Sequence, residues 1–555
     1  MIKMRSLFTL LFSLTILSAF AQPVTFPWAK SFGGYSGTTG KLFLDKDASG
    51  NIYMAGQFTG TRSFGSTTLT AAGSSDLLVA KFDPAGNFLW ATKGGAFQSV
   101  AAASGLTLAD GKVMVTGYFT GNLAVGNFTV SNGGSAYKEI FIAALDTANG
   151  SCTWLNNIGG AYDDFSSGIT PATGGGFYLC GNFRQSIVLG NDTLSSTSFL
   201  DPDAFYAKFD QSGNCIWGRE VGGFGTEETG GIKEINANEI VMNGSFEGSI
   251  LLANGQSITS VAVADFMLIK FDSQGTVLWG KSGGSTNTDQ GYALDTDAQG
   301  NIYSTGIIGA NSTFGSVSIS NNQNLNMFIA KHNSLGVCQW VKMAGDILDD
   351  MGLDIAVDAG GSSYVTGYVS GNPTFGTTPF PGVVAKEGYV AKYNTLGTLI
   401  WVARIGGNGI DRGKSIILTG NGTAVVAGEF DQNITVGANT ITAVTGGDFT
   451  TFLVKLEGGT VGGAEEPTSI PMVCYPNPAQ NELNLVFDAS MINSLSAVWI
   501  TDMTGREVMR LSSADWNVST NNLQIDISSM PAGTYMVGVA QSSGAQQYRQ
   551  VVIVD

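Results

Sequence analysis

The amino-acid sequence predicts an all-β fold in which seven repeated units close into a seven-bladed β-propeller. Three observations predict it. A tryptophan returns at a nearly constant spacing, each interval holds short strand-like segments separated by turn residues, and no interval has sustained helical periodicity. Four-stranded units arranged around a channel protect their sheet edges by repetition, which is the β-propeller architecture.

The tryptophan repeat sets the size of the unit. Seven tryptophans lie 61 to 64 residues apart: Trp28, Trp90, Trp154, Trp217, Trp279, Trp340 and Trp401. A glycine pair follows most of them, and a further glycine opens a short segment, as Gly291 does after Trp279. A polar turn, an aromatic and β-branched segment, and a segment of alternating apolar residues complete the unit. We therefore expect about four strands in each unit, with the glycine-opened strand innermost, where backbones approach closely.

The two ends of the repeat region predict how the ring closes. The last unit ends at residues 448–457 without the tryptophan strand that should follow, and the chain begins with an unpartnered one at 26–34. The simplest arrangement pairs the N-terminal strand with the last unit, so that the propeller occupies residues 22–457. An open solenoid is the alternative, and it would leave two exposed strand edges.

These landmarks resemble the SBBP-type β-propeller repeat of secreted bacterial proteins. The matching patterns are the tryptophan with its glycine pair, D-x-x-G-N-I-Y-x-x-G, and D-x-F-x-x-K-F-D-x-x-G, over about residues 26–457. The resemblance implies the seven-bladed fold. It does not identify a ligand, because one fold supports many functions.

The N-terminus has the form of a signal peptide. Lys3 and Arg5 precede an apolar run, and Ala19 and Ala21 form an A-x-A cleavage site, so residues 1–21 are predicted to be removed. No later segment has the length of apolar sequence that a transmembrane helix needs. We expect export from the cytoplasm without a transmembrane segment.

A different region follows the repeats. Residues 458–471 read as a glycine- and proline-containing linker. Residues 472–555 resemble the type A C-terminal sorting domain of the Bacteroidetes type IX secretion system. The matching positions are Tyr475, Pro476, Asn477, Pro478, Gly505, Gly533 and Tyr535. The resemblance implies a small Ig-like β-sandwich, the type IX machinery as a partner, and an extracellular or outer-membrane-surface location. An ordinary β-sandwich binding module is the alternative.

Composition excludes several function classes. The formal net charge of −17 disfavours nucleic acid, which needs a basic footprint. The single histidine, His332, falls at a strand position and leaves no Ser/His/Asp arrangement or histidine zinc site. The five cysteines lack disulfide or CxxC spacing, so we expect buried free thiols. No cofactor is required by the sequence, although the acidic balance makes Ca²⁺ possible.

Acidic residues form the candidate site. The position two residues before the innermost-strand glycine is acidic in four consecutive units: Glu228, Asp289, Asp350 and Asp411. In a ring they would form an arc near one mouth of the channel, where converging oxygens could bind a cation or polar ligand. The alternative is structural, because Asp can cap its own turn. The D-x-D-x-S-G run at 45–50 is interpreted as a β-turn, since Gly56 stands where a calcium loop needs Glu.

Three functions remain open. The first is a non-catalytic surface or secreted binding protein, adhesin-like or glycan- or protein-binding. The second is an extracellular carbohydrate-active enzyme with carboxylates near the channel mouth, and the third is a structural component of a surface layer or gliding machinery. The irregular loops at 131–140, 195–203 and 377–388 are the places where we expect binding residues. An enzyme is disfavoured, since no catalytic constellation is evident.

Overall fold

A computed structural model describes residues 24–458 and 473–554. The first range omits 36–40, 66, 96–100, 197, 199–200, 310, 321–323, 381–384, 421 and 444–448, and the second omits 476–477, 487–494, 503–505, 512–521 and 542–545. The described residues fall into two compact units, one within Ala21–Gly459 and one within Thr460–Asp555. Every regular element in them is a β-strand, and none of the described residues forms a helix long and apolar enough to cross a membrane.

Each repeat in the first unit folds into a four-stranded antiparallel meander. The first complete one consists of β2 (Phe43–Lys46), β3 (Ile52–Phe58), β6 (Asp76–Phe82) and β7 (Phe88–Gly95), hydrogen-bonded in chain order. The same order recurs in β8 (Ala101–Ala109), β9 (Lys112–Phe119), β12 (Glu139–Asp146) and β13 (Cys152–Ile158); in β14 (Phe165–Pro171), β15 (Phe177–Phe183), β18 (Asp203–Phe209) and β19 (Cys215–Val221); in β20 (Glu227–Asn236), β21 (Glu239–Phe246), β24 (Asp265–Asp272) and β25 (Val277–Gly284); in β26 (Gln290–Thr296), β27 (Ile302–Ile308), β30 (Asn326–His332) and β31 (Cys338–Gly345); and in β32 (Met351–Val357), β33 (Ser363–Val369), β36 (Glu387–Tyr393) and β37 (Leu399–Gly407).

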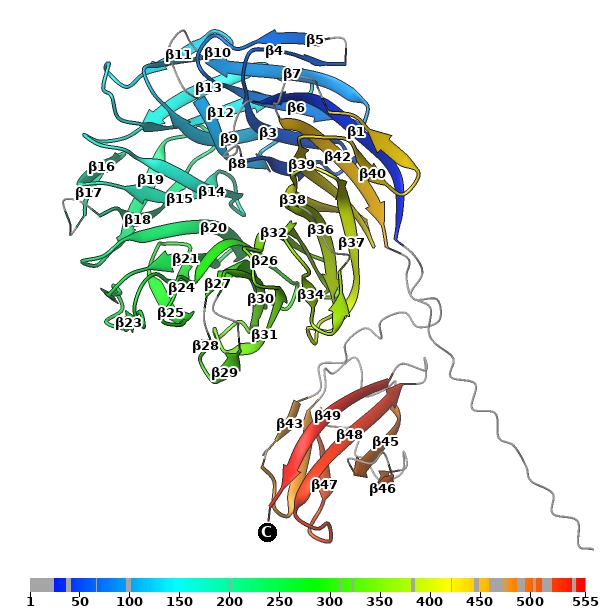
Figure 1. Cartoon of the computed structure of the whole chain (residues 1–555). Helices are drawn as coiled ribbons and strands as arrows, with labels where there is room; N and C mark the ends of the chain where they lie inside the picture. The colour runs from blue at the N-terminus through cyan, green and yellow to red at the C-terminus, as the bar shows by residue number, and fades with distance from the viewer. Residues whose placement is uncertain are drawn as a thin grey trace, which may run out of the picture. The chain divides into compact units, whose positions relative to one another are not determined.

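The last sheet joins the two ends of the repeat region. It contains β38 (Asp411–Gly420), β39 (Thr423–Phe430), β42 (Phe449–Glu457) and, as its outermost strand, β1 (Thr25–Tyr35), which runs antiparallel to β42 with Trp28 opposite Lys455. The blue and yellow strands therefore lie side by side in Figure 1.

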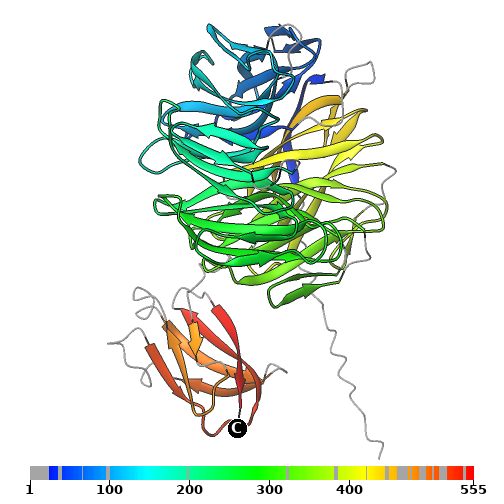
Figure 2. The same ribbon diagram turned by 90° about the vertical axis from the view of Figure 1, so that its left-hand side faces the viewer.

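The innermost strands connect the sheets into a ring. Each contacts the innermost strand of the next repeat, and β38 contacts β2 across the junction of the first and last repeats. Gly168 shows why small residues suit these strands, because a Cβ on it would lie 3.1 Å from the Cα of Gly231 on the neighbouring innermost strand. Figure 1 and Figure 2 show the sheets arranged around this centre. The ring closes by packing between separate sheets rather than by one continuous hydrogen-bonded sheet.

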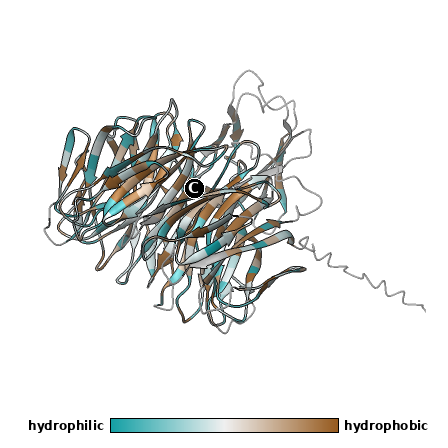
Figure 3. Cartoon of the chain, turned by 90° about the horizontal axis from the view of Figure 1, so that it is seen from above, coloured by the Kyte–Doolittle hydropathy of each residue, from teal (hydrophilic) through white to brown (hydrophobic). Residues whose placement is uncertain are grey.

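The middle strands form the core between neighbouring sheets. All seven residues of β15 and of β27 are buried, because both faces of these sheets are covered. Apolar residues accordingly recur along the strands in Figure 3.

A short hairpin from each following repeat covers an outer strand. The hairpin β10–β11 extends the sheet of β7, and its counterparts add to β25, β31 and β37 in the same way. These contacts shield part of an edge that would otherwise be free to pair with another chain. The hairpins are β4 (Thr61–Phe64) with β5 (Thr67–Thr70), β10 (Asn122–Val125) with β11 (Phe128–Ser131), β16 (Ser186–Leu189) with β17 (Asp192–Ser195), β22 (Ser249–Leu251) with β23 (Ser257–Thr259), β28 (Ser312–Phe314) with β29 (Val317–Ile319), β34 (Thr374–Phe375) with β35 (Thr378–Pro379), and β40 (Ile434–Val436) with β41 (Asn439–Ile441).

The tryptophan repeat is a contact between neighbouring sheets. The ring of Trp90 lies against Gly150 in the turn between the third and fourth strands of the next repeat, and a Cβ on Gly150 would be 2.5 Å from it. Gly150 also has a φ of 73°, which favours glycine. The same contact occurs in all seven places: Trp28–Gly86, Trp90–Gly150, Trp154–Gly213, Trp217–Gly275, Trp279–Gly336, Trp340–Gly397 and Trp401–Gly458. The sequence period therefore reflects one packing contact made by every repeat.

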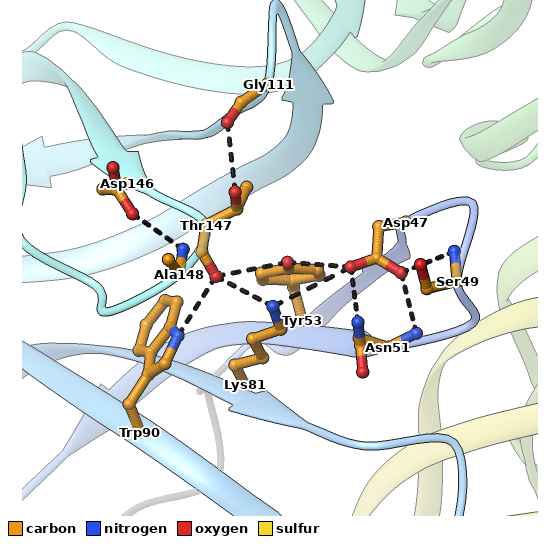
Figure 4. A network of polar contacts seen from close by, with 10 residues as sticks. All are labelled: Asp47, Ser49, Asn51, Tyr53, Lys81, Trp90, Gly111, Asp146, Thr147 and Ala148. Atoms are coloured by element: carbon orange, nitrogen blue, oxygen red, sulfur yellow. Dashed lines mark hydrogen bonds and ion pairs between the residues drawn. The ribbon is translucent and has the colours of Figure 1, made fainter.

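Polar contacts reinforce the tryptophan packing (Figure 4). The carbonyl oxygen of Thr147 accepts hydrogen bonds from Lys81 Nζ at 2.8 Å and Trp90 Nε1 at 3.3 Å. Tyr53 donates its hydroxyl to Asp47 Oδ2 at 3.1 Å. The Asp47 carbonyl also accepts the backbone N–H of Gly50, so the predicted β-turn in the 45–50 run spans residues 47–50, just after β2. We call the end of the strands that carries these turns the turn rim.

The second unit contains two sheets that share one core. One sheet holds β43 (Val473–Tyr475), β44 (Glu482–Val486) and β47 (Asn522–Asp526), and the other holds β45 (Leu495–Asp502), β46 (Glu507–Leu511), β48 (Gly533–Gln541) and β49 (Gln546–Ile553). Leu485, Val498 and Ile525 are among the buried residues between them.

Two of the predicted sorting-motif positions lie on β48. Gly533 begins this strand, and Tyr535 is buried with its hydroxyl donated to the carbonyl of Pro531 at 2.9 Å. Tyr475 ends β43, and Pro478 is exposed just after it. Pro476, Asn477 and Gly505 lie outside the described residues, as do the predicted signal peptide with Ala19 and Ala21 and nearly all of the linker.

Candidate functional site

A repeated acidic residue lies where the chain passes from one sheet to the next. The backbone N–H at the start of each connecting loop donates to a carboxylate four residues later: Gly160 to Asp164 at 2.7 Å, Gly223 to Glu227 at 3.2 Å, Asp346 to Asp350 at 2.9 Å and Gly407 to Asp411 at 2.8 Å. In the remaining described loop of this kind, Asp289 accepts the Ser285 hydroxyl at 2.7 Å. We call this set the loop acids, and all five are fully buried. The end of the strands that carries them, opposite the turn rim, is the acid rim.

The structure places three of the four predicted site residues at one equivalent position and the fourth outside it. Asp289, Asp350 and Asp411 are loop acids, whereas Glu228 is exposed, and its neighbour Glu227 occupies the loop-acid position. The register shows this, because Thr229 pairs with Gly244 as Gly291 pairs with Gly306.

Sequence reasoning also missed Asp164. Alignment on Gly168 placed Ser166 at the candidate position, but Gly168 lies after the bulge of its strand whereas Gly291 lies before the equivalent bulge. Ser166 therefore corresponds to Gly291, and the loop acid lies two residues before Ser166. A signal was present in the sequence: each loop acid follows by five residues a glycine at the end of the outer strand, namely Gly159, Gly222, Gly284, Gly345 or Gly406.

A second polar residue faces each of those glycines. It is the first residue of the third strand, and a Cβ on the glycine would collide with it, as on Gly222 with Asp203 and on Gly284 with Asp265. We call these residues the strand acids. They are Glu139, Asp203, Asp265 and Glu387, with Asn326 at the equivalent place in one repeat, and Asp76 faces Gly95 in the same way. The glycine of each pair is thus required because its missing side chain leaves room for a carboxyl group.

Burial dominates the electrostatics of these acids. It raises the pKa of Asp164 and of Glu227 to about 8, and that of Asp350 and Asp411 to about 7. Desolvation disfavours the charged carboxylate, and neighbouring carboxyl groups add to the effect in each case. Among the described residues, no group of three or more His, Cys, Asp and Glu side chains is arranged to hold a metal ion.

A separate pocket lies beside the innermost strands at the acid rim. Its volume is about 340 Å³, and its walls come from the segment before β2 and from β8, β14 and β20. Its lining includes Lys41, Gln57, Ser104, Tyr118, Asp163, Phe165, Ser166, Asn182, Arg184, Pro202, Glu228 and Thr229. We call it the mouth pocket, and it is where the structure places the predicted residue Glu228.

Charge and aromatic surface meet in the mouth pocket. The Lys41 side chain is exposed, and partial desolvation beside the pocket lowers its pKa, while the charge of Glu228 acts in the opposite direction. Tyr118 and Phe165 pack edge to face with ring centres 5.3 Å apart, and Lys138 Nζ lies over both rings at 5.0 and 4.8 Å. The pocket therefore offers hydrogen-bond donors, acceptors and an aromatic wall.

The three loops predicted from the sequence to carry binding residues differ in whether they line the mouth pocket. Pro202, in the 195–203 loop, lines the mouth pocket. The 131–140 loop is a compact turn in which the Asn132 amide donates to the carbonyls of Ser135 and Tyr137. In the part of 377–388 that the structure describes, Lys386 donates to the Tyr368 hydroxyl at 3.0 Å.

Histidine and cysteine lie away from the pocket lining. His332 ends β30, is 3% exposed and stacks on Phe266, and its burial lowers its pKa to about 4. Cys152, Cys180, Cys215 and Cys338 are free thiols, and burial raises the pKa of each. These results confirm the buried strand histidine and show that these four cysteines form no disulfide.

Comparison with known proteins identifies the C-terminal region. Residues 473–554 match the family of the secretion system C-terminal sorting domain. The chain therefore carries a type IX sorting domain, which indicates export to the cell surface or extracellular space and handling by the type IX machinery.

Two curated proteins are distantly similar to the chain. The chain is 22% identical to an uncharacterized WD repeat-containing protein, L264, of Acanthamoeba polyphaga mimivirus over 73% of its own length and 36% of the relative's. It is 24% identical to the regulatory protein FlaEY of Caulobacter vibrioides over 68% and 41% of the two lengths. The chain thus spans well under half of each relative.

Two solved structures are similar at a low level. They are the quinohemoprotein alcohol dehydrogenase from Comamonas testosteroni, with 10% identity, coverage of 85% and 80% and a TM-score of 0.36, and PorZ of Porphyromonas gingivalis, with 10% identity, coverage of 94% and 100% and a TM-score of 0.17. At these scores neither structure bears on the function of this chain.

Proposed function

We propose that this chain is an exported, non-catalytic binding protein, that its repeats form a seven-bladed β-propeller, and that its mouth pocket holds a glycan. The observation that carries the proposal is the mouth pocket, in which Lys41, Glu228 and an aromatic wall converge from several sheets. Concave sites with a few convergent polar groups are the usual form of a ligand site.

The seven-bladed arrangement is supported by contacts across the two ends of the repeat region. Trp28 packs on Gly86, β38 contacts β2, and the Leu44 backbone N–H donates to the Ser415 hydroxyl at 3.1 Å. These contacts join the last sheet to the first in the way that other sheets are joined. The two sheets of the second unit are compatible with the Ig-like sandwich that the sorting-domain resemblance implies.

A glycan suits the chemistry of the pocket. Sugar hydroxyl groups both donate and accept hydrogen bonds, so they can use the Lys41 ammonium group as a donor and the Glu228 carboxylate as an acceptor. The apolar faces of a sugar ring pack on aromatic side chains, and Tyr118 and Phe165 line the pocket. Surface location places such a pocket where polysaccharides are available.

A carbohydrate-active enzyme is the alternative that the same pocket would permit. Glycoside hydrolysis needs two carboxyl groups on opposite sides of the scissile bond. Asp163 is the second carboxyl group in the pocket, but its Oδ1 accepts the Lys138 backbone N–H at 2.8 Å and so holds a loop. The loop acids Asp289, Asp350 and Asp411 are fully buried. Binding without turnover is therefore the better account.

The test is binding of the mature chain, residues 22–555, to a glycan array with Ca²⁺ and with chelator. We expect saturable binding that Glu228→Gln weakens about tenfold or more, because hydrogen bonds to charged groups contribute roughly 1.5–3 kcal/mol. Glu220→Gln is the matched control, because Glu220 is exposed on β19 and outside the pocket. Absence of binding, with self-association or capture of a protein partner, would replace the proposal with a structural role. Release of reducing ends from a bound polysaccharide would instead show that the chain is a carbohydrate-active enzyme.

A further inference from the structure

Three basic side chains gather at the acid rim beside the innermost strand of the last sheet. Arg412 and Lys414 lie on β38, and Lys386 immediately precedes β36 of the neighbouring sheet. We call these three residues the basic cluster. Arg412 is 6% exposed, and Lys414 keeps 12% of its side chain exposed. The cluster therefore places basic groups inside the ring of a chain whose formal net charge is −17.

Aromatic rings and one carboxylate hold the cluster in place. The Arg412 guanidinium donates to Glu429 Oε1. Its Cζ lies 5.7 Å from the ring centre of Tyr368 and 5.2 Å from that of Phe449. Lys386 Nζ donates to the Tyr368 hydroxyl at 3.0 Å and lies 4.1 Å from the centre of the same ring. Cation–π contacts of this kind orient a basic group without neutralising its charge.

The charges of the cluster do not balance. Lys414 Nζ lies 3.2 Å from Glu429 Oε1, the same oxygen that accepts from Arg412. Glu429 is fully buried. Within the part of the chain that the structure describes, no second carboxylate lies within ion-pair distance of Lys386, Arg412 or Lys414. Three basic groups therefore share one carboxylate.

Lys414 shows the effect of this imbalance. Burial lowers the pKa of Lys414, and among the charged groups around it Glu429 raises the pKa whereas Arg412 and Lys386 lower it. An enclosed charge is stable only where opposite charge or hydrogen bonds compensate it. A further anion beside Lys414 would therefore stabilise the cluster.

Lys41 connects the basic cluster to the mouth pocket. It lines the pocket and leads into β2, the innermost strand that contacts β38. A Cβ on Gly56 would lie 3.4 Å from the Lys41 carbonyl oxygen, and a Cβ on Gly428 would lie equally close or closer to the Arg412 carbonyl oxygen. Lys41 thus occupies on the first sheet the place that Arg412 and Lys414 occupy on the last, at the same mouth of the ring.

Basic groups outnumber acidic groups where the pocket meets the cluster. Lys41 and the basic cluster have two acids beside them: Glu429, which is paired with Lys414, and Glu228, which lines the pocket with Lys41. The pocket adds one base, Arg184, and one acid, Asp163. A locally positive mouth on an acidic chain attracts anionic groups to this place.

We infer that the glycan of the mouth pocket is acidic, and that a carboxylate or sulfate group on one of its sugars lies between Lys41 and Lys414. The inference rests on the proposed function of the pocket and names the class of glycan. Lysine ammonium groups form charge-assisted hydrogen bonds with either anion. Arg412 is a positioning residue in this arrangement, because it shares Glu429 with Lys414 and leaves part of the Lys414 charge for the ligand.

The test compares acidic glycans with neutral counterparts of the same backbone, using the mature chain, residues 22–555. The probes are uronate polysaccharides with their carboxyl-reduced forms, and sulfated polysaccharides with their desulfated forms. We expect the acidic member of a pair to bind about tenfold or more tightly, and its affinity to fall as salt is raised. Loss on carboxyl reduction assigns a carboxylate, and loss on desulfation assigns a sulfate.

Two results would overturn the inference in different ways. Equal binding of acidic and neutral members would overturn it and leave glycan binding by the pocket in place. Absence of binding to every glycan would overturn the proposed function and the inference with it.

Variants of Lys41 separate charge from shape. Lys41 is exposed, so its variants should fold. Lys41→Glu should weaken binding of the acidic glycan about tenfold or more and leave binding of its neutral counterpart unchanged, whereas Lys41→Arg should keep the preference for the acidic form. Lys46→Glu is the matched control, because Lys46 is exposed at the other end of β2.

Lys414→Gln tests the second lysine. It leaves Glu429 paired with Arg412, so the carboxylate is not stranded. We expect the preference for the acidic glycan to fall in K414Q as it does in K41E, at an unchanged melting temperature. If K41E and K414Q both keep the wild-type preference, the anionic group does not lie between the two lysines.

Discussion

The two rims of the ring are built from the same repeats but by different rules. At the turn rim, every repeat makes the tryptophan–glycine contact, and the lysine, tyrosine and tryptophan polar groups of the first repeat are satisfied by one turn (Figure 4). The contact itself is kept where the polar partner is not, since Trp154 and Trp217 Nε1 have no hydrogen-bond partner. At the acid rim, the strand-acid position holds Asp, Glu or Asn, and several carboxylate oxygens lack a partner. The uniform rim serves assembly, whereas the variable rim carries the mouth pocket and the buried titratable groups.

Removal of the N-terminal strand should have the largest effect on this comparison. A chain that starts at residue 37 lacks β1, and with it Trp28 and the outermost strand of the last sheet. The truncation leaves the edge of β42 unpaired and removes one contact between sheets. Because the free energy of unfolding of a protein is only about 5–15 kcal/mol, we expect this loss to cause aggregation or unfolding. Thermal melting followed by circular dichroism measures the loss of stability, and size-exclusion chromatography detects aggregation.

The control for this truncation is the chain that starts at Gln22, which keeps β1. If the chain from residue 37 melts at the same temperature as that control, the closure between β1 and β42 does not hold the ring together.

Gly150→Ala should break one contact at the turn rim. Its added methyl group would meet the Trp90 ring at 2.5 Å, and Gly150 has a positive φ. Gly133→Ala is a matched control, because Gly133 has a φ of 68° and nothing within 4 Å of the added Cβ. We expect the free energy of unfolding of both variants to fall by roughly 1–2 kcal/mol, because alanine is strained at a positive φ. In G150A it should fall by about 1–3 kcal/mol more, because the added methyl group overpacks against Trp90. Equal losses in urea unfolding would show that the tryptophan contact can relax.

The acid rim should make stability depend on pH in an unusual direction. Burial raises the pKa of Asp164 and Glu227 to about 8 in the folded chain, whereas unfolded carboxyl groups titrate near their model value. Between these values the folded state binds more protons than the unfolded state, so unfolding releases protons and stability falls as pH rises. We expect a decrease on the order of 1–3 kcal/mol for each of these two loop acids between pH 5 and 9.

Urea midpoints across this pH range measure the decrease, provided that the m-value stays constant. A stability that rises steadily from pH 5 to 9 would mean that the loop acids are ionised throughout.

The sequence predicted the all-β repeats because tryptophan, glycine and turn residues each mark one contact that every repeat must make. It also predicted that Asp289, Asp350 and Asp411 are equivalent. It misplaced Glu228 and missed Asp164, because the glycine used for the alignment does not keep one register. Gly291, Gly352 and Gly413 lie just before the bulge of the innermost strand, whereas Gly168 lies just after it and Gly230 lies within it. The mouth pocket could not be predicted at all, since Lys41, Tyr118 and Asn182 are brought together by ring geometry rather than by a motif.

The smallest effect on stability, and the sharpest comparison, comes from two adjacent glutamates. Glu227 is fully buried and is a loop acid, whereas Glu228 is exposed and lines the mouth pocket. Glu228→Gln should change the free energy of unfolding by no more than about 0.5 kcal/mol, as exposed substitutions usually do, while it weakens ligand binding. Glu227→Gln should instead flatten the pH dependence of stability. If the two variants exchange these phenotypes in urea unfolding and glycan binding, the register that separates the loop acid from the pocket residue is wrong.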